Sequence, residues 1–485
     1  MPLMLFGEYR PDVSDYEGQT SRNILNVVPR GDGYGPVKAL TSLSSALASA
    51  CRGGFVAQMA DGSAKIFAAS STRIYTMSNT DYTWTDVSKG GLAYSALSSD
   101  ANWQFQQFGN YVIAVQANIV PQVFDLTSSS EFADLGGSPP QAAYIDVVNQ
   151  FVVLSGLASF PYRIQWSGLN AVTTWDGTNQ SDYQDFGDGG YVRGVAGGES
   201  GVVFQDNAIR RMIFAGPPLV FQIDRISQDN GIDAPYSIIR AGDRVFFHSP
   251  KGFHVLSQGG YPQPIGRERV DRTFMADLDV GSKRLFIGAS DPRSSRVYWV
   301  FKSTNGVTDQ FDAMLCYDYT LDKWTRTNIS GEYLLPLSQP GITLETLGTI
   351  YASLESVPGS LDDYSSVQSP ELAAFGTDHK FSFFRGSNLE ATLESAELGT
   401  DGKRIFVRGF RPVTDAATVY GSASYRETLT GTATAGSEIV RNTRTGRCDL
   451  RRSARYSRLK ARIPPSESWT YIAGIEPDMV PEGTQ

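Results

Sequence analysis

Short apolar runs joined by polar turns recur along most of the chain. Residues 244–259, for example, place the turn "SPKG" between the apolar runs "RVFFH" and "FHVL". An apolar run, a small or polar turn, and a second run rich in aromatic and β-branched residues are typical of an antiparallel β-hairpin. The same plan is found in residues 65–78, 111–126, 151–167, 201–216, 244–259 and 284–301. The pattern therefore predicts an all-β protein built from repeated hairpins.

The hairpins are regularly spaced. Their first apolar positions are Ile66, Val112, Val152, Val202, Val245 and Leu285, with gaps of 46, 40, 50, 43 and 40 residues. A further hairpin lies around Ala373, 88 residues beyond Leu285, and residues 313–329 between them fit an outer blade hairpin. Because propeller blades repeat at about 40–50 residues, we predict a β-propeller of six or seven blades over residues 51–398. A pair of β-sandwiches with similar strand spacing is the alternative fold.

Two segments fall outside this repeat. Residues 1–50 contain the Gly/Pro-rich stretch "NVVPRGDGYGP", which cannot be regular structure for long. We expect these residues to form an N-terminal arm and a strand that closes the propeller. Residues 399–485 include the strand-like runs "RIFVRGFRPV", "TVYGSASYRE" and "WTYIAGIEP". They predict an additional small C-terminal β domain of basic character.

One strand of this predicted domain has a strongly basic face. In residues 456–463, Ser457, Leu459, Ala461 and Ile463 form one face, and Tyr456, Arg458, Lys460 and Arg462 form the other. Side chains alternate between the two faces of a strand, so the polar face is cationic. We predict that Arg451, Arg452, Arg458, Lys460 and Arg462 contribute to an interface with an acidic partner or a sister subunit. The alternative is a solvated strand face with no partner.

Charge is unevenly distributed along the chain. The formal net charge is −9, but residues 401–462 carry fourteen Lys or Arg against five Asp or Glu. The body of the chain before them is therefore acidic, and head-to-tail contacts between copies become electrostatically favourable. Direct gripping of DNA is disfavoured, because proteins that grip DNA usually carry a basic surface overall.

The sequence offers few candidate catalytic or metal-binding residues. His248 and His254 flank one turn without a third ligand at a metal spacing, and the aspartates of residues 176–188 lack the alternate spacing of a calcium loop. Cys51, Cys316 and Cys448 lie far apart and are expected to be reduced thiols. No apolar run is long enough for a signal peptide or a membrane span. We therefore expect no catalytic residues, no metal, no cofactor and no membrane anchor.

Several strings, in order along nearly the whole chain, resemble the tail nozzle or hub proteins of short-tailed bacteriophages, a family of tail tubular and packaged-DNA stabilisation proteins. They are "YRPDVSDYEGQTSRNILNVVPRGDGYGP", "NWQFQQFGNYVIAVQ", "YRIQWSGLNAVTTWD", "GVVFQDNAIRRMIFAGPPLVFQID", "GIDAPYSIIRAGDRVFFHSPKGFHVL", "IGRERVDRTF" and "RYSRLKARIPPSESWTYIAGIEPDM". The resemblance implies a structural virion protein, assembled in the host cytoplasm, whose six copies form a homohexamer in the tail.

In such a tail the ring lies below an adaptor ring under the portal, holds packaged double-stranded DNA and conducts it outwards without sequence-specific contact. The resemblance leaves open whether tail fibres attach to this chain, and it brings no catalytic residues. We expect the acidic excess of residues 1–400 to face the passage, where like charge keeps DNA from sticking. The alternative functions are a glycan-binding or glycan-cleaving propeller tail protein and a non-viral propeller scaffold.

Overall fold

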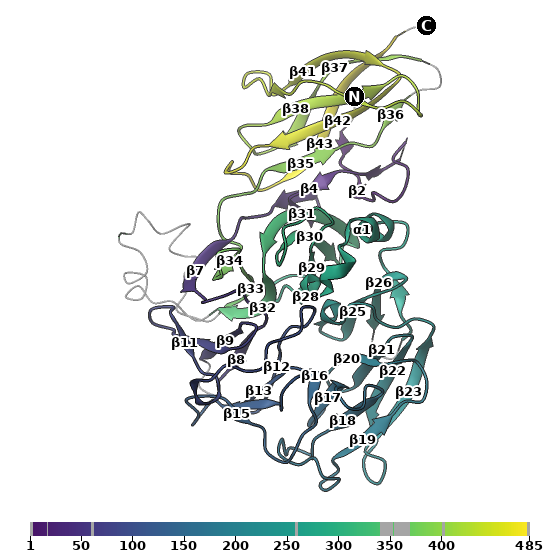
Figure 1. The fold of residues 1–485 in the computed structure, drawn as a ribbon. Coiled ribbons are helices and arrows are strands. Elements are labelled where there is room, and N and C mark those ends of the chain that lie inside the picture. The colour runs from purple at the N-terminus through teal and green to yellow at the C-terminus, as the bar shows by residue number, and fades with distance from the viewer. Residues whose placement is uncertain are drawn as a thin grey trace.

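The computed structural model describes residues 3–16, 18–59, 63–257, 260–339, 353, 369–399 and 403–482. Within these residues nearly all regular structure is β-strand, and the α-helical part is the short helix α1 (Asp271–Asp277). The strands form a ring of sheets and a second β unit at its rim (Figure 1). The fold is thus all-β, as the hairpin pattern predicts.

Seven four-stranded antiparallel units are found among the described residues: six are separate sheets, and the unit β28–β31 is the first part of an 11-stranded sheet. The strands of each unit are mostly consecutive in sequence. In chain order the sheets are β8 (Gly54–Gln58), β9 (Ala64–Ala69), β10 (Ile74–Met77), β11 (Trp84–Asp86); β12 (Gln104–Phe108), β13 (Tyr111–Val115), β14 (Gln122–Asp125), β15 (Ala133–Asp134); β16 (Ala142–Val148), β17 (Phe151–Leu157), β18 (Arg163–Trp166), β19 (Asp182–Asp185); β20 (Val192–Ala196), β21 (Gly201–Gln205), β22 (Ala208–Phe214), β23 (Phe221–Gln228); β24 (Ile239–Ala241), β25 (Arg244–Ser249), β26 (Gly252–Ser257), β27 (Gln263–Pro264); β28 (Ile287–Ser290), β29 (Arg296–Phe301), β30 (Phe311–Asp318), β31 (Lys323–Gly331); and β32 (Tyr333–Gln339), β33 (Ser369–Phe375), β34 (Lys380–Phe383), β7 (Thr41–Ala46).

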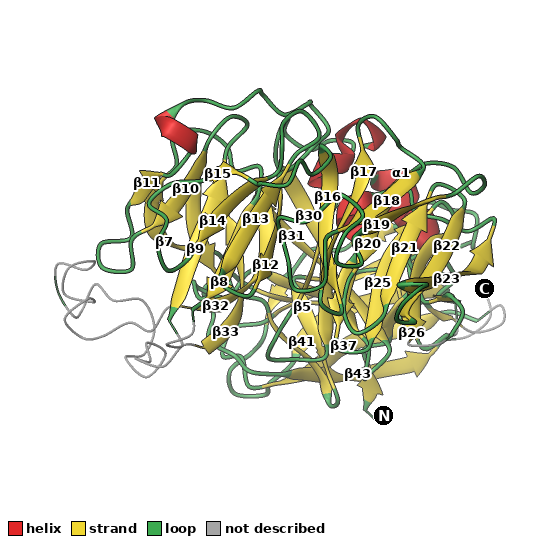
Figure 2. Ribbon diagram, turned by 90° about the horizontal axis from the view of Figure 1, so that it is seen from below, coloured by secondary structure: helices red, strands yellow, loops and turns green. Residues whose placement is uncertain are grey.

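The first strands of these sheets surround a common axis. Strands β8, β12, β16 and β20 contact one another in turn, β24 contacts β28, β28 contacts β32, and β32 returns to β8. Figure 2 shows the strands side by side around the molecule, with their connections gathered at two faces. This closed ring is a β-propeller of seven blades, and it excludes the alternative of paired β-sandwiches.

The spacing of the hairpins is explained by their places in the blades. Ile66, Val112, Val152, Val202 and Val245 all lie on the second strand of a blade. Leu285, by contrast, ends the 3-10 turn Val280–Leu285 that precedes the first strand of the sixth blade. The predicted hairpin of residues 284–301 is therefore β28–β29, one strand earlier in its blade than the others.

The seventh blade is closed by the N-terminal segment. Strand β7 pairs with β34, so that Ser42 lies opposite Ser382 and Thr41 opposite Phe383. The Ser44 hydroxyl accepts hydrogen bonds from the Phe381 amide at 3.0 Å and from the Trp84 indole of the first blade at 3.1 Å. The fourth strand of the last blade and the edge of the first are thereby fastened to each other.

Aromatic side chains fill the spaces between neighbouring blades. Between the first and second sheets, Phe67 meets Phe124 and Phe132 at ring-centroid distances of 5.2 and 5.6 Å in edge-to-face geometry. All three rings are fully buried. Burying one such ring contributes about 1.5–3 kcal/mol, so interdigitated rings of this kind give each blade a stable neighbour.

The second unit takes strands from both ends of the chain. One sheet contains β41 (Cys448–Ala454), β37 (Ile405–Thr414), β43 (Ile472–Pro481), β6 (Gly33–Pro36) and β5 (Val27–Arg30), with β1 (Met4–Leu5) beside β43. The other continues from β31 through β4 (Ile24–Leu25), β35 (Ala391–Glu394), β42 (Tyr456–Ile463), β38 (Tyr420–Arg426) and β39 (Thr434–Ala435), with β36 (Leu398–Gly399) and β40 (Ile439–Val440) at its sides.

These pairings correct the linear boundaries drawn from composition. Strand β35 lies within residues 51–398 but pairs with β42, and the arm of residues 1–50 supplies four strands to the second unit in addition to β7. The physical reason is that β4 and β6 pair with strands hundreds of residues away, and β5 follows as the hairpin partner of β6. Composition along the chain does not reveal such long-range pairing.

Asn26 links the second unit to the propeller. Its amide nitrogen Nδ2 donates to the Glu390 carbonyl at 2.7 Å, and its Oδ1 accepts from the Asn328 amide at 2.8 Å. Asn26 also donates its own backbone N–H to the Arg326 carbonyl at 2.8 Å. The side chain is nearly buried, so one residue satisfies backbone groups of both parts where β4 meets β31.

Candidate functional site

The predicted basic strand is present as β42. Its residues are buried at alternate positions, with Ser457, Leu459, Ala461 and Ile463 inside. It lies between β38 and β35, so Arg458 is opposite Ser424 and Lys460 is opposite both Ser422 and Glu394. The alternation of faces predicted from the sequence is confirmed, and the cations project from the face that is not core.

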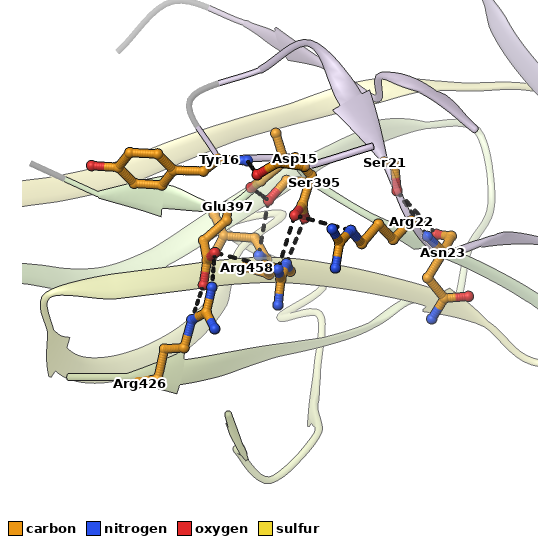
Figure 3. Close-up of polar contacts among 12 residues, drawn as sticks. Asp15, Tyr16, Ser21, Arg22, Asn23, Ser395, Glu397, Arg426 and Arg458 are labelled. Atoms are coloured by element: carbon orange, nitrogen blue, oxygen red, sulfur yellow. Dashed lines mark hydrogen bonds and ion pairs between the residues drawn. The ribbon is translucent and has the colours of Figure 1, made fainter. Parts of the chain in front are cut away.

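Arg458 is held by two buried carboxylates (Figure 3). Its Nε and one terminal nitrogen donate to Asp15 at 2.6 and 2.9 Å, and the same terminal nitrogen donates to Glu397 Oε2 at 3.3 Å. The side chains of Asp15 and Glu397 are each 2% exposed. Arg426 also pairs with Glu397, and Arg22 approaches Asp15 at 3.5 Å. We call these five side chains the arginine clamp.

The clamp fixes the N-terminal arm against the second unit. Asp15 comes from the arm, whereas Arg458 comes from β42 and is 443 residues away in sequence. The backbone reinforces the contact, because the Glu397 amide donates to the Asp15 carbonyl at 3.0 Å. Tyr16 packs edge-on against Tyr456 with ring centroids 5.6 Å apart. A bidentate Arg–carboxylate pair of this kind is both directional and strong.

The electrostatics of the clamp follow from burial and charge together. Burial raises the pKa of Asp15, but the hydrogen bonds and positive charge of Arg458 outweigh it, and the pKa lies below its usual value. The same hydrogen bonds raise the pKa of the Arg458 guanidinium against the opposing effect of burial. Both partners are therefore charged at neutral pH.

Lys460 and Arg462 also have acidic partners within the chain. Arg462 donates to Glu438 at 2.6 Å and to Glu390 at 2.8 Å, and Lys460 lies 3.7 Å from Glu438. These carboxylates are a third to a half exposed. The three cations of β42 that the sequence offers as interface residues are thus occupied by intramolecular ion pairs.

Arg451 and Arg452 differ from the cations of β42. Both lie in β41 and are exposed, and no ion pair within the described residues of 403–482 or the arm involves them. Between Val407 and Gly409 the pairing of β37 with β41 shifts register, which places the exposed Arg408 at the same bulge. We call Arg408, Arg451 and Arg452 the basic bulge. In Figure 1, β37 and β41 lie at the end of the molecule farthest from the propeller.

The two histidines of the fifth blade belong to its packing. His248 is fully buried, and its ring lies edge-on to Phe253, Phe274 and Phe286 at centroid distances of 5.0, 5.1 and 5.3 Å. Burial lowers its pKa to about 3, so the ring is neutral. His254 Nδ1 lies 2.8 Å from a backbone carbonyl of the turn. Their positions match the interpretation of both as residues that flank a blade hairpin.

The aspartates of residues 176–188 point to separate partners. Asp176 accepts from the amide and hydroxyl of Thr178 at 3.1 and 2.6 Å, which closes a local turn. Asp185 binds Arg163 through two hydrogen bonds of 2.6 and 2.8 Å. Asp188 pairs with two arginines, one on β22 and one on β23. Within the described part of the chain, no group of three His, Cys, Asp or Glu side chains is placed to hold a metal ion.

A small cavity lies on the propeller axis. Its volume is about 220 Å³, and it is lined by residues from the first strands of the blades, among them Gln104, Tyr144, Arg240 and Tyr333. Asp146 also faces it, where burial raises the pKa of this carboxyl to about 6. The side chains of the first strands therefore narrow the propeller axis to a small cavity.

The structure also bears on the cysteines and on membrane-spanning helices. Cys51, Cys316 and Cys448 are buried free thiols, as expected from their separation in sequence. Among the residues that the structure describes, no helix has the length and apolar character needed to cross a membrane.

Comparison with known proteins adds structural likenesses only. No family model matches the chain, and no curated protein matches it. The chain is similar to the crystal structure of BamB from Moraxella catarrhalis, with 12% identity, coverage of 65% of this chain and 88% of that one, and a TM-score of 0.34. The chain is also similar to YCF48 bound to D1 peptide, with 13% identity, coverage of 47% of this chain and 69% of that one, and a TM-score of 0.31. It is similar to the computationally designed Ika8 protein, with 10% identity, coverage of 74% of this chain and 98% of that one, and a TM-score of 0.34. At these scores the likenesses carry no argument about function, and the propeller is established by its own sheets.

Proposed function

We propose that this chain is a structural virion protein of a short-tailed bacteriophage and forms one subunit of the ring-shaped tail nozzle or hub. In this role a homohexamer lies beneath the adaptor ring under the portal, retains packaged DNA and conducts it during ejection. The observation that carries the proposal is the ordered series of family-like strings from residue 9 to residue 479. The propeller fused to a second β unit at its rim is compatible with a subunit that contacts several neighbours.

We infer that the DNA passage lies between subunits, because the propeller axis is narrow. A cavity of about 220 Å³ cannot admit a duplex, whose major groove alone is about 12 Å wide. A ring of copies would therefore enclose the DNA, and no blade axis would serve as the channel. We further propose that the acidic excess of residues 1–400 faces this passage. A surface map of the assembled ring with a passage lined mainly by Lys and Arg would overturn that part.

The basic bulge is the best-placed surface for contact between copies or with the adaptor. Arg408, Arg451 and Arg452 are exposed at one end of the molecule, whereas the rest of the chain is acidic. Opposite charges on two surfaces of one chain favour heterologous, head-to-tail contacts, which close into rings. Arg458, Lys460 and Arg462 would act indirectly here, because their ion pairs hold β42 in place.

Electron microscopy of particles that carry this chain tests the proposal directly. Six copies at the distal part of the tail are the expected result, and a location of the chain elsewhere in the particle would refute the proposal. Interface contact is tested by reversing charge at the bulge with R451E/R452E. The expected result is loss of ring assembly or tail attachment with unchanged thermal unfolding. The matched control R267E/R272E makes the same charge change on exposed propeller residues and should assemble normally. Equal assembly of both variants would exclude the basic bulge.

A further inference from the structure

Four aromatic side chains are exposed together on the third and fourth blades. Phe160, Tyr162, Tyr183 and Tyr191 have exposed fractions of 52%, 47%, 49% and 41%. We call these four rings the aromatic platform. Large rings are normally among the most buried contributors to a core, so a group of exposed ones marks a binding surface.

The topology of the blade brings these rings to one face. Phe160 and Tyr162 lie between the second and third strands of the third blade, and Tyr191 lies between its fourth strand and the next blade. Successive antiparallel strands run in opposite directions, so these two connections leave the sheet at the same face. Helix α1, which follows the fourth strand of the fifth blade, lies on that face as well. Figure 1 shows the third blade on the side of the propeller opposite the second unit.

Arg163 supports two of the rings. Its guanidinium carbon lies 4.3 Å from the ring centroid of Phe160 and 3.6 Å from that of Tyr183. Two hydrogen bonds to Asp185, at 2.6 and 2.8 Å, hold the guanidinium in this position. Each ring has one face against the arginine and is about half exposed, which leaves a second face open to a ligand. Cation–π contact and a bidentate carboxylate together make this arrangement rigid.

The other two rings form a similar unit. Tyr162 and Tyr191 pack edge to face with centroids 4.9 Å apart. The Arg193 guanidinium carbon is 5.3 Å from the Tyr191 ring centroid, and its Nε donates to Asp206 at 2.7 Å. Backbone hydrogen bonds from the Phe186 amide to the Tyr162 carbonyl and from the Val192 amide to residue 161 fasten the loop. The platform is thus ordered before any ligand binds, which lowers the entropic cost of binding.

The charges around the platform select the ligand class. Arg163 and Arg193 are each paired with an aspartate, and Asp188 nearby is paired with two further arginines. With the exposed Asp182 on the same segment, the surface carries no positive excess. Nucleic acids and acidic polysaccharides require a positive surface and are disfavoured here. A neutral sugar presents C–H faces that pack against aromatic rings and hydroxyls that bond to carboxylates and amides. The carboxylates of Asp185 and Asp206, which pair with the two arginines and are 56% and 33% exposed, supply such groups.

We propose that the aromatic platform is a binding site for a neutral glycan. The site is a surface for recognition and is independent of ring formation, so it is tested on the purified chain. If the platform fails to bind glycan, the proposed role in the tail is unaffected, and if the ring proposal fails, the glycan site is still measurable.

The experiment uses the full chain, fluorescently labelled, on an array of neutral and acidic oligosaccharides, followed by titration with the neutral sugar that binds best. Because each variant removes one of the rings that would contact the sugar, Tyr183→Ala and Tyr191→Ala should each weaken binding about tenfold, which corresponds to about 1.4 kcal/mol. Tyr183→Phe keeps the ring and should retain most of the affinity. The matched control is Tyr261→Ala, because Tyr261 is 71% exposed and comes from the fifth blade.

Binding to neutral sugars that is lost in the two platform variants and kept in Tyr261→Ala supports the site. Binding restricted to acidic sugars, no binding to neutral ones, or equal binding by all variants would overturn it. The proposal also fails if the array is blank and Tyr183→Ala instead changes the sedimentation mass of the protein, because the platform is then a protein interface.

Discussion

Replacing Arg458 by methionine (R458M) removes the guanidinium that Asp15 and Glu397 share, while a long unbranched side chain remains in β42. Both carboxylates are 2% exposed, so each becomes a buried charge with fewer partners. Breaking a buried ion pair by removing one partner costs about 3–5 kcal/mol. Arg426 still pairs with Glu397, and Arg22 remains 3.5 Å from Asp15. We therefore expect the lower end, about 3 kcal/mol, as the loss in unfolding free energy.

The assay is equilibrium urea unfolding followed by circular dichroism and Trp fluorescence. R462M is the matched control on the same strand, because Arg462 pairs with carboxylates that are 33% and 46% exposed, and such pairs contribute about 0–1 kcal/mol. The double variant D15N/R458M should recover part of the loss, since the unpaired charge is removed. An R458M variant no less stable than R462M, or a double variant without recovery, would refute the reasoning.

The loss of unfolding free energy in R458M should also depend on pH. In the wild-type protein the pKa of Asp15 is lowered, so its contribution to stability is present above the usual carboxyl pKa and is lost as the pH falls through the lowered value. Without Arg458, burial raises the pKa of Asp15, and protonation then relieves the buried charge. The difference between wild type and R458M should therefore shrink from pH 7 to pH 4. A constant difference over this range would contradict the assignment of the cost to Asp15.

Three further predictions concern the propeller. The pKa of His248 is lowered from 6.5 to about 3, so stability is present above pH 6.5 and falls by about 2 kcal/mol between pH 6.5 and 5. H248F should abolish that part of the loss in urea unfolding at the two pH values, and an unchanged loss would exclude His248 as its source. S44A leaves the Phe381 amide without its hydrogen-bond acceptor and should cost about 1–3 kcal/mol. Hydrogen exchange should then increase in β34 and β7 but not in the fourth blade. A Cβ at Gly137 would lie 1.7 Å from a backbone carbonyl oxygen, whereas one at Gly177 would meet nothing within 4 Å, although both residues have φ above +80°. G177A should therefore cost about 1–2 kcal/mol and G137A clearly more in thermal unfolding, and equal costs would show that only backbone strain matters.

The basic residues of 401–462 show that composition can predict an excess of charge but not the partners of each charged side chain. The excess of Lys and Arg there is real, but Arg458 is satisfied by Asp15 of the arm and Arg462 by Glu390 of the segment that follows the propeller. A count of charges along the chain does not register a partner that is 443 residues away. Of the five predicted interface residues, Arg451 and Arg452 are exposed and have no ion pair among the described residues, and their role in an interface stays a prediction.

The sequence by itself determined the local patterns. Alternation of apolar and polar side chains in residues 456–463 fixed which side of β42 is buried, and the spacing from Ile66 to Val245 fixed the repeat of the blades, because side-chain periodicity and turn chemistry are local properties. The tertiary structure decided which strands pair across the chain. It placed β7 in the last blade, drew β4, β5 and β6 into the second unit, and gathered Phe160, Tyr183 and Tyr191 on one face. These outcomes depend on hydrogen bonds and contacts between residues far apart in sequence, which no local pattern encodes.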